Sequence, residues 1–461
     1  MSVETNTEQL GSESILHLLI KFSVPAIIGL VVNAMYNVVD RIFIGNGVGS
    51  LGIAAITVSF PVAIIIIAFG VLTATGASSL LSLKLGARRI DEAELVIGQA
   101  LTLLSVGSLL VTIIGSLYIE PILKLFGASA DVMPYAKDYL QIILLGGLIQ
   151  CLGYVFTHFA RAEGRPRIAM FSLLIGAVTN IVLDYVFIFI FAWGIRGAAF
   201  ATVLGQLVSA IWILSYFLRG NSVLKIRLKY LKPNKPMLIA MVSLGLGAFA
   251  MQLAASMLNV FLNKVLKAYG GDIAISSFGV VYSLVYLLLM PVFGISQGVQ
   301  PIIGYNYGAK RYDRVKEALL LSTSGATIVV TIGFIITRIY PAELIALFNA
   351  HDQALIDLGT KALNIFLMFV PVVGFQVIGA NYFQAVGKPK QAMLLTLSRQ
   401  VLLLIPALFI LPRFFGLDGI FYAGPISDVL ATILTALCLT AEMKQLRYQP
   451  TQVFNESDAV A

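Results

Sequence analysis

Long apolar runs separated by short polar segments dominate the chain. An apolar stretch of about 20 residues is long enough to cross the roughly 30 Å core of a bilayer as a helix. We count twelve such stretches, centred near residues 29, 68, 108, 149, 179, 208, 249, 285, 328, 369, 402 and 430. The pattern therefore predicts an all-α integral membrane protein with twelve transmembrane helices, and it leaves no room for a folded soluble domain.

The composition agrees with a membrane location. Apolar residues make up 59% of the 461 residues and charged residues only 12%, against roughly 25% charged residues in soluble domains. This balance excludes a cytosolic globular enzyme. The two cysteines, Cys151 and Cys438, lie in apolar runs and predict neither a disulfide framework nor a thiolate metal site. The net charge is +8, but no basic face exists outside short loops, so we expect no nucleic-acid partner.

The loop charges predict the orientation. If the N-terminus is cytoplasmic, most of the 31 lysines and arginines fall on the inner side, as the positive-inside rule requires. Both termini should then be cytoplasmic. The N-terminus is acidic and polar, unlike the basic start of a cleaved signal, so we expect the first apolar stretch to be retained as helix 1.

An internal repeat divides the chain into halves. Residues 86–89 match 308–311, and residues 162–166 match 385–389, at an offset of 222 to 223 positions. Six spans per half is an even number, so both halves enter from the same side. This predicts two parallel six-helix lobes related by a pseudo-two-fold axis along the membrane normal, an arrangement suited to alternating access. Duplication retained only for packing is the alternative.

The segment from Arg219 to Lys235 carries six basic residues and no acid, and it contains Pro233. These features predict a cytoplasmic linker between the lobes. We assign residues 1–218 to the N-terminal lobe, 219–236 to the linker, 237–445 to the C-terminal lobe and 446–461 to a cytoplasmic tail.

Only three acids, Asp40, Asp184 and Asp428, fall inside the apolar spans. Such residues are costly in a bilayer and are functional candidates by default. Counting along helices 1, 5 and 6 places Asp40 and Asp184 at a similar depth to Asn180 and Thr202. Two carboxylates, an amide and a hydroxyl can surround Na⁺ or take up a proton. Alternatively, Asp40 pairs with the adjacent Arg41 and Asp184 caps a packing network.

A polar stripe on helix 1 precedes Asp40. Asn33, Tyr36 and Asn37 lie seven, four and three residues before it, so they share its face. We expect this stripe, with Gln206 on helix 6, to line a cavity for substrate, because polar groups facing lipid would be costly. Pro25 permits a kink in helix 1, which either gates the cavity or is static.

The second lobe lacks both coupling candidates. At the repeat offset Asp40 corresponds to about Leu262, and Asp184 to Ala407. Near mid-membrane, Arg399 and Asp428 lie at matching depths on consecutive helices, so we predict a buried ion pair. The rival interpretation makes Asp428 a second proton site and Arg399 a contact for a substrate phosphate.

Three motifs indicate a family. They are the tract from Pro25 through YNVVDRIFIG, the loop KLGARRIDEA with its counterpart YGAKRYDRVKEA, and the paired Ala-x-Gly-x-Pro turns. Together they resemble the MATE family of multidrug and toxin extrusion transporters, most closely the DinF-type or MepA-like branch. The resemblance implies a monomeric antiporter in the prokaryotic inner membrane that exports amphipathic organic cations in exchange for H⁺ or Na⁺. It also implies that Asp40, Asn180, Asp184 and Thr202 form the cation-coupling site.

Two other functions remain to be weighed. A flippase for a lipid-linked saccharide would need several cations in its cavity, whereas Arg399 is the only basic residue well inside a span. A membrane enzyme would need metal ligands or a catalytic dyad, but His17, His158 and His351 are isolated. We therefore expect no catalytic residues and no cofactor.

Overall fold

The computed structural model describes residues 4–219, 222–348 and 352–447, and every regular element in these ranges is helical. The first half contains α1 (Glu4–Ser12), α2 (Ile15–Gly47), α3 (Ser50–Gly86), α4 (Ile90–Leu117), α5 (Ile119–Leu125), α6 (Met133–Ala162), α7 (Pro166–Tyr185), the π-helical turn η1 (Val186–Ile190) and α8 (Gly194–Leu218).

The second half follows the 3₁₀ turn η2 (Leu228–Leu231). It contains α9 (Lys235–Gly308), α10 (Tyr312–Ile339), α11 (Pro341–Ala346), α12 (Gln353–Phe366), η3 (Val370–Val372), α13 (Val373–Ala385), α14 (Pro389–Leu397), η4 (Ser398–Leu404) and α15 (Ile405–Arg447). Two long elements bend sharply. The backbone leaves helical geometry at Gly271 in α9 and at Gly416 in α15, and both glycines have positive φ, which a residue without a Cβ adopts readily.

The spans confirm the twelve-helix prediction. Nine helical segments of the described chain are each long and apolar enough for one crossing, and residues 353–366 and 370–385 are together long and apolar enough for one more, with a bend of 46° between them. The segment Pro389–Leu446 has 58 residues, which would extend about 87 Å as one straight helix. The break at Gly416 turns it into two crossings.

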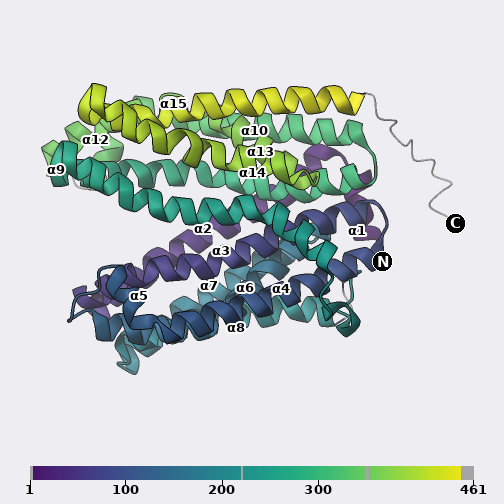
Figure 1. Ribbon diagram of the computed structural model, residues 1–461, viewed down its shortest axis with the longest axis horizontal. Coiled ribbons are helices and arrows are strands. Elements are labelled where there is room, and N and C mark those ends of the chain that lie inside the picture. Colours follow the sequence, from purple (N-terminus) through teal and green to yellow (C-terminus); the bar gives the residue numbers. More distant parts are fainter. Residues whose placement is uncertain (1–3, 220–221, 349–351, 448–461) are drawn as a thin grey trace.

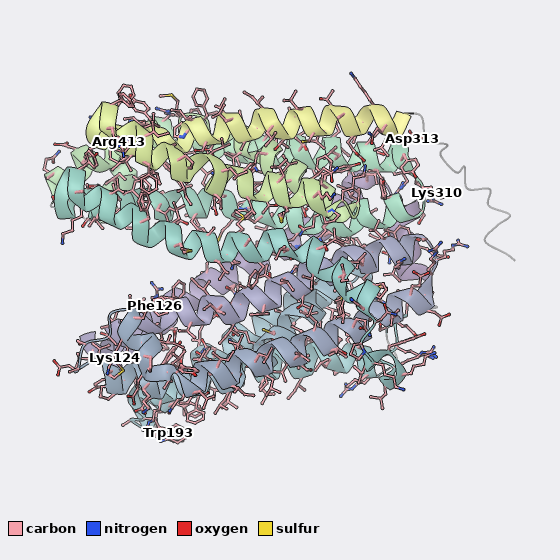
Figure 2. The ribbon with its side chains drawn as sticks, in the orientation of Figure 1. Lys124, Phe126, Trp193, Lys310, Asp313 and Arg413 are labelled. Atoms are coloured by element: carbon pink, nitrogen blue, oxygen red, sulfur yellow. The ribbon has the colours of Figure 1, made fainter. Side chains whose placement is uncertain are left out.

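The helices form two groups, shown in Figure 1. We call α2–α8 the N-terminal lobe and α9–α15 the C-terminal lobe. Helix α1 lies at the same end of the molecule as the C-terminal end of α15, and we call this end the terminal side. Figure 2 places Lys310 and Asp313 at the terminal side and Lys124, Trp193 and Arg413 at the opposite side.

Reciprocal contacts across α3 and α9 reveal the pseudo-two-fold axis. A Cβ on Gly86 would lie 1.9 Å from the carbonyl oxygen of Tyr305, and a Cβ on Gly308 would lie 2.1 Å from that of Leu83. The repeat offset of 222 relates Gly86 to Gly308 and also Leu83 to Tyr305. Each lobe therefore inserts the same glycine against the same carbonyl of the other lobe, and any larger side chain would separate them.

The lobes are joined at the terminal side. Arg161, in the last turn of α6, donates to Gln297 Oε1 at 2.7 Å, and Gln300 donates to Ser79 Oγ at 2.9 Å. Farther along, a Cβ on Gly298 would lie 2.7 Å from Ser23 Oγ. These contacts lie in the terminal half of their helices, so the structure is a form closed at the terminal side.

Residues 222–234 of the linker pack against the N-terminal lobe. Gln99 on α4 donates to the carbonyl oxygens of Tyr230 and Lys232, and Thr102 donates to that of Leu231. At the linker's start, Glu163 accepts hydrogen bonds from Tyr216, Ser222 and the backbone amides of residues 223 and 224. Helix α8 ends at Leu218 and α9 begins at Lys235. The segment between them agrees closely with the predicted linker of residues 219–236.

Candidate ion and substrate pocket

Four helices of the N-terminal lobe enclose a pocket of about 120 Å³. Helix α2 contributes Asn33 and Tyr36, and α7 contributes Asn180. Helix α8 contributes Thr202 and Gln206. These five residues were all predicted from sequence to line a cavity or an ion site. The volume is several times the 10–15 Å³ that one water molecule needs, so the pocket can admit part of an organic molecule.

Sequence reasoning missed one wall of the pocket. Helix α6 contributes Gln150, Tyr154 and Thr157, and α8 adds Ser209. The three α6 residues recur at intervals of four and three, so they share one face of the helix. The same polar-stripe argument that singled out helix 1 would have found them.

A close helix contact brings the ion-site residues together. A Cβ on Gly205 of α8 would lie 2.8 Å from the carbonyl oxygen of Gly176 and 3.0 Å from the Cβ of Asn180. The missing side chain allows α8 to approach α7, and Asn180 Nδ2 then donates to Thr202 Oγ1 at 3.5 Å. Helix α7 ends just beyond this contact, and the chain continues as the π-helical turn η1. Short π-helical segments are often found at functional sites.

The two acids lie one turn beyond the pocket-lining residues. Asp40 follows Tyr36 by four positions on α2, and Asp184 follows Asn180 by four positions on α7. Asp40 is 9% exposed and Asp184 is fully buried. Their side chains are close enough to interact, and both lie near Tyr139 of α6. The structure thus brings Asp40, Asn180, Asp184 and Thr202 into one cluster.

Several oxygens of this cluster lack a hydrogen-bond donor among the described residues. They are Oδ1 of Asp40, Oδ1 of Asn180 and both carboxylate oxygens of Asp184. The alternative pairing of Asp40 with Arg41 does not occur as an ion pair in the described structure. Buried oxygens without donors are costly and match the oxygen ligands that a small hard cation prefers.

Two further predictions concern Pro25 and Asn37 on helix 1. Helix α2 runs unbroken from Ile15 to Gly47 through Pro25, so Pro25 does not interrupt helix 1 in this form. The side chain of Asn37 lies outside the described part of the structure.

The predicted ion pair of the C-terminal lobe is present. Arg399 Nε donates to Asp428 Oδ1 at 2.6 Å, and the two side chains are 16% and 6% exposed. Arg399 lies in the π-helical segment η4 (Ser398–Leu404) and Asp428 lies in α15. The acid that the sequence places inside this lobe's apolar spans thus has a cationic partner, whereas Asp40 and Asp184 form no ion pair with a described residue.

The fold and the pocket define a class of protein: a two-lobed, multi-pass membrane transporter with a polar pocket in one lobe. The model of the MatE family matches residues 25–186 and 248–410. The two matches begin 223 positions apart, which is the offset of the internal repeat. The chain belongs to the MatE family.

Similar proteins cover nearly the whole chain. Multidrug export protein MepA of Staphylococcus aureus strain MRSA252 is 28% identical over 416 residues, spanning 90% of this chain and 91% of that protein. A structure of the MATE multidrug transporter DinF-BH in complex with a ligand is 38% identical, covers 96% of this chain and 99% of that one, and superposes with a TM-score of 0.88. A MATE structure in complex with MaL6 is 25% identical with the same coverage and a TM-score of 0.90.

Proposed function

We propose that this protein exports amphipathic organic cations from the cell in exchange for inward movement of H⁺ or Na⁺. The observation that carries the proposal is the pocket of the N-terminal lobe, which leads to buried oxygens of Asp40, Asn180 and Asp184 without donors. The similarity to MepA, named as a multidrug export protein, and to DinF-BH, named as a multidrug transporter, supports the same conclusion.

The lining of the pocket suits flat, weakly polar cations. It combines two tyrosine rings, Tyr36 and Tyr154, with amide and hydroxyl groups, and the described lining contains no lysine or arginine. Aromatic faces attract organic cations, while amides adapt to different hydrogen-bonding partners. The carboxylates at the end of the pocket supply the negative charge.

The same carboxylates can couple transport to an ion. Two buried carboxylates within interaction range repel each other when both are charged. A proton or Na⁺ bound to Asp40 and Asp184 relieves this repulsion, and so does the positive charge of a substrate. Ion and substrate therefore compete for one negative site, which is the condition for exchange by alternating access.

The positive-inside bias supports an orientation with the terminal side in the cytoplasm of a prokaryotic cell. With that orientation, a form closed at the terminal side is the outward-facing one, in which external H⁺ or Na⁺ reaches the pocket. A monomer contains both lobes and is sufficient for this cycle.

Reconstituted proteoliposomes test the proposal. Movement of a fluorescent organic cation is measured under a pH gradient alone and then under a Na⁺ gradient alone. We expect uphill transport under at least one gradient, and its loss in Asp40→Asn. Transport under neither gradient would overturn the proposal. A second arm offers a fluorescent lipid-linked diphosphate, and its translocation without cation transport would favour the flippase alternative.

A further inference from the structure

Helix α1 crosses from one lobe to the other at the terminal side. It precedes α2 of the N-terminal lobe in sequence, yet it packs against α9 of the C-terminal lobe. Leu10 is fully buried there. Asn306 Nδ2 donates to the carbonyl oxygen of Leu10 at 2.8 Å, and Arg311 donates to that of Gly11 at 2.5 Å. The C-terminal lobe therefore holds the backbone of a helix that is covalently joined to the other lobe through α2.

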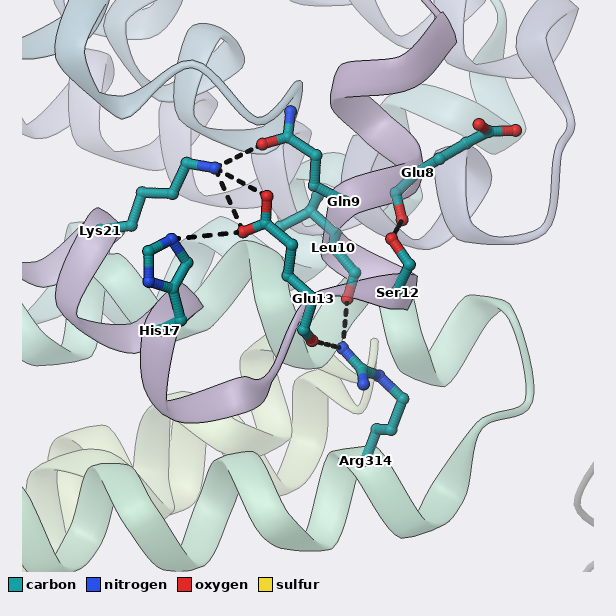
Figure 3. Close-up of polar contacts among 8 residues, drawn as sticks. All are labelled: Glu8, Gln9, Leu10, Ser12, Glu13, His17, Lys21 and Arg314. Carbon is teal, nitrogen blue, oxygen red and sulfur yellow. Dashed lines mark hydrogen bonds and ion pairs between the residues drawn. The ribbon is translucent and has the colours of Figure 1, made fainter.

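Arg314 and Lys21 complete the crossing, as Figure 3 shows. Arg314 of α10 donates to the carbonyl oxygens of Leu10, at 3.3 Å, and Glu13, at 2.6 Å. Lys21 of α2 donates to the carboxylate of Glu13 at 3.0 Å and to Gln9 Oε1 at 2.5 Å. Glu13 thus binds one lobe through its side chain and the other through its backbone.

The physical reason for the docking lies at the end of α1. The last carbonyl groups of a helix have no partners within the helix, and cations are favoured there. Arg311 and Arg314 satisfy these carbonyls with charge-assisted hydrogen bonds, which are stronger than neutral ones. An α-helix of nine residues has little stability of its own, so we expect α1 to depend on this docking.

The repeat shows that this arrangement is particular to one lobe. Arg89 and Glu92 are the counterparts of Arg311 and Arg314 at an offset of 222. In the N-terminal lobe Glu92 pairs with Arg89 at 3.3 Å and also with Lys84. Because an arginine stands in the place of this acid in the C-terminal lobe, that lobe presents two cations to the end of α1.

We propose that α1 is a latch that stabilises the form closed at the terminal side and must leave the C-terminal lobe before this side opens. The reason is geometric: α1 is covalently joined to α2 but hydrogen-bonded to α9 and α10. Separating the lobes at this end stretches the chain between Glu13 and Lys21 unless α1 is released. The proposal rests on the alternating access proposed above.

Distance measurements between the lobes test the latch. Arg167 and Lys390, which are exposed and related by the repeat, are changed to cysteine and spin-labelled after Cys151 and Cys438 are replaced by alanine. Pulsed electron resonance on the full-length protein in nanodiscs then reports the closed and open populations at the terminal side, without substrate or gradient. The result is therefore independent of whether organic cations are transported.

The key comparison is Arg311→Gln with Arg89→Gln, the same change at repeat-related positions. We expect Arg311→Gln to raise the ratio of open to closed form at least about tenfold, the effect of losing one hydrogen bond from a charged group, and Arg89→Gln to leave it unchanged. Deletion of residues 2–12 should raise the ratio further. Equal shifts in Arg311→Gln and Arg89→Gln, or no shift in both Arg311→Gln and the deletion, would overturn the latch.

Discussion

The two lobes share a helix arrangement but differ in how they treat the acids that lie inside their transmembrane spans. The N-terminal lobe buries Asp40 and Asp184 beside each other without an ion pair to any described residue, whereas the C-terminal lobe pairs its buried Asp428 with Arg399 at 2.6 Å. Burying an unpaired carboxylate lowers the stability of the fold by several kcal/mol. A buried acid of this kind is therefore a candidate for a functional role. Among the described residues, the two lobes thus share a scaffold, but only the N-terminal lobe has acids inside its spans that form no ion pair.

The same contrast recurs at the terminal side. In the N-terminal lobe the buried carboxylate of Glu163 is held by hydroxyl and backbone N–H donors of Tyr216, Ser222 and residues 223–224. In the C-terminal lobe Glu442 instead pairs with Lys388 at 2.5 Å. Glu163 is thus held by neutral donors and forms no ion pair with a described residue, whereas Glu442 is neutralised by a lysine.

The largest effect is expected from a substitution of one of the unpaired acids of the N-terminal lobe. Asp184→Asn keeps the shape of the side chain but removes its negative charge, so gradient-driven transport should fall to the level of empty liposomes. Protein yield should be maintained and the thermal unfolding midpoint should stay level or rise, because the change removes a buried charge whose burial is unfavourable. The measurement is initial uptake of a fluorescent cation into proteoliposomes, together with differential scanning fluorimetry.

Asp357→Asn is the matched control for this change. Asp357 is an exposed acid of α12 that accepts from Gln353, and its substitution should leave transport unaltered. Uphill transport by a well-folded Asp184→Asn protein would remove Asp184 from the coupling site.

A second, intermediate effect concerns the paired site of the C-terminal lobe. Asp428→Leu leaves the Arg399 guanidinium buried without a partner, and a guanidinium cannot neutralise itself by losing a proton. We expect a loss of about 3 kcal/mol of stability. Arg399→Leu should cost less, since a carboxyl group can take up a proton. The double change to leucine should recover most of the loss, as measured by thermal unfolding in one detergent.

The order of stability among Asp428→Leu, Arg399→Leu and the double variant shows whether the two side chains act mainly by compensating each other's charge. If the double variant is less stable than either single variant, then the pair contributes more than mutual charge compensation. Equal stability of all three with the unchanged protein would mean that the pairing at 2.6 Å has no energetic role.

Much of the fold and part of the site follow from sequence because each rests on a regular spacing. The hydrophobic runs predict the twelve spans, and the matching loops around Gly86 and Gly308 predict the parallel lobes. Helical counting was sufficient to bring Asp40, Asn180, Asp184 and Thr202 to one depth, and Arg399 to Asp428. These arguments work because consecutive spans cross the membrane in opposite directions. The number of residues between a side chain and the nearest loop therefore gives its depth.

Sequence reasoning was weaker where tertiary packing decides. The crossing of α1 to the other lobe depends on Arg311 and Arg314 meeting helix-end carbonyls about 300 positions earlier in the chain, and no local pattern encodes that contact. The ordering of the linker by Gln99 is likewise a long-range effect. Glu163 lies in the first of the Ala-x-Gly-x-Pro turns that the sequence predicts. It is nevertheless 1% exposed, because groups of the linker cover it.

The smallest expected effect sharpens the contrast at the terminal side through pH. Burial raises the pKa of the Glu163 carboxyl above its ordinary value of 4.5, while the hydrogen bonds from Ser222 and Tyr216 act in the opposite direction. A carboxyl whose pKa is higher in the folded state favours folding when protonated. Its stabilising contribution is therefore complete below about pH 4.5 and is lost as the pH rises through the folded-state pKa.

Glu163→Gln should remove this part of the pH dependence, because glutamine does not titrate. The unfolding midpoint of the unchanged protein should decline relative to that of Glu163→Gln as the pH rises from about 4.5, by an amount equivalent to about 1.4 kcal/mol for each unit by which the pKa is raised. Ser222→Ala removes a hydrogen bond that favours the charged carboxylate and should steepen the decline. A constant difference between the unchanged protein and Glu163→Gln across this range would show that the donors around Glu163 compensate fully for its burial.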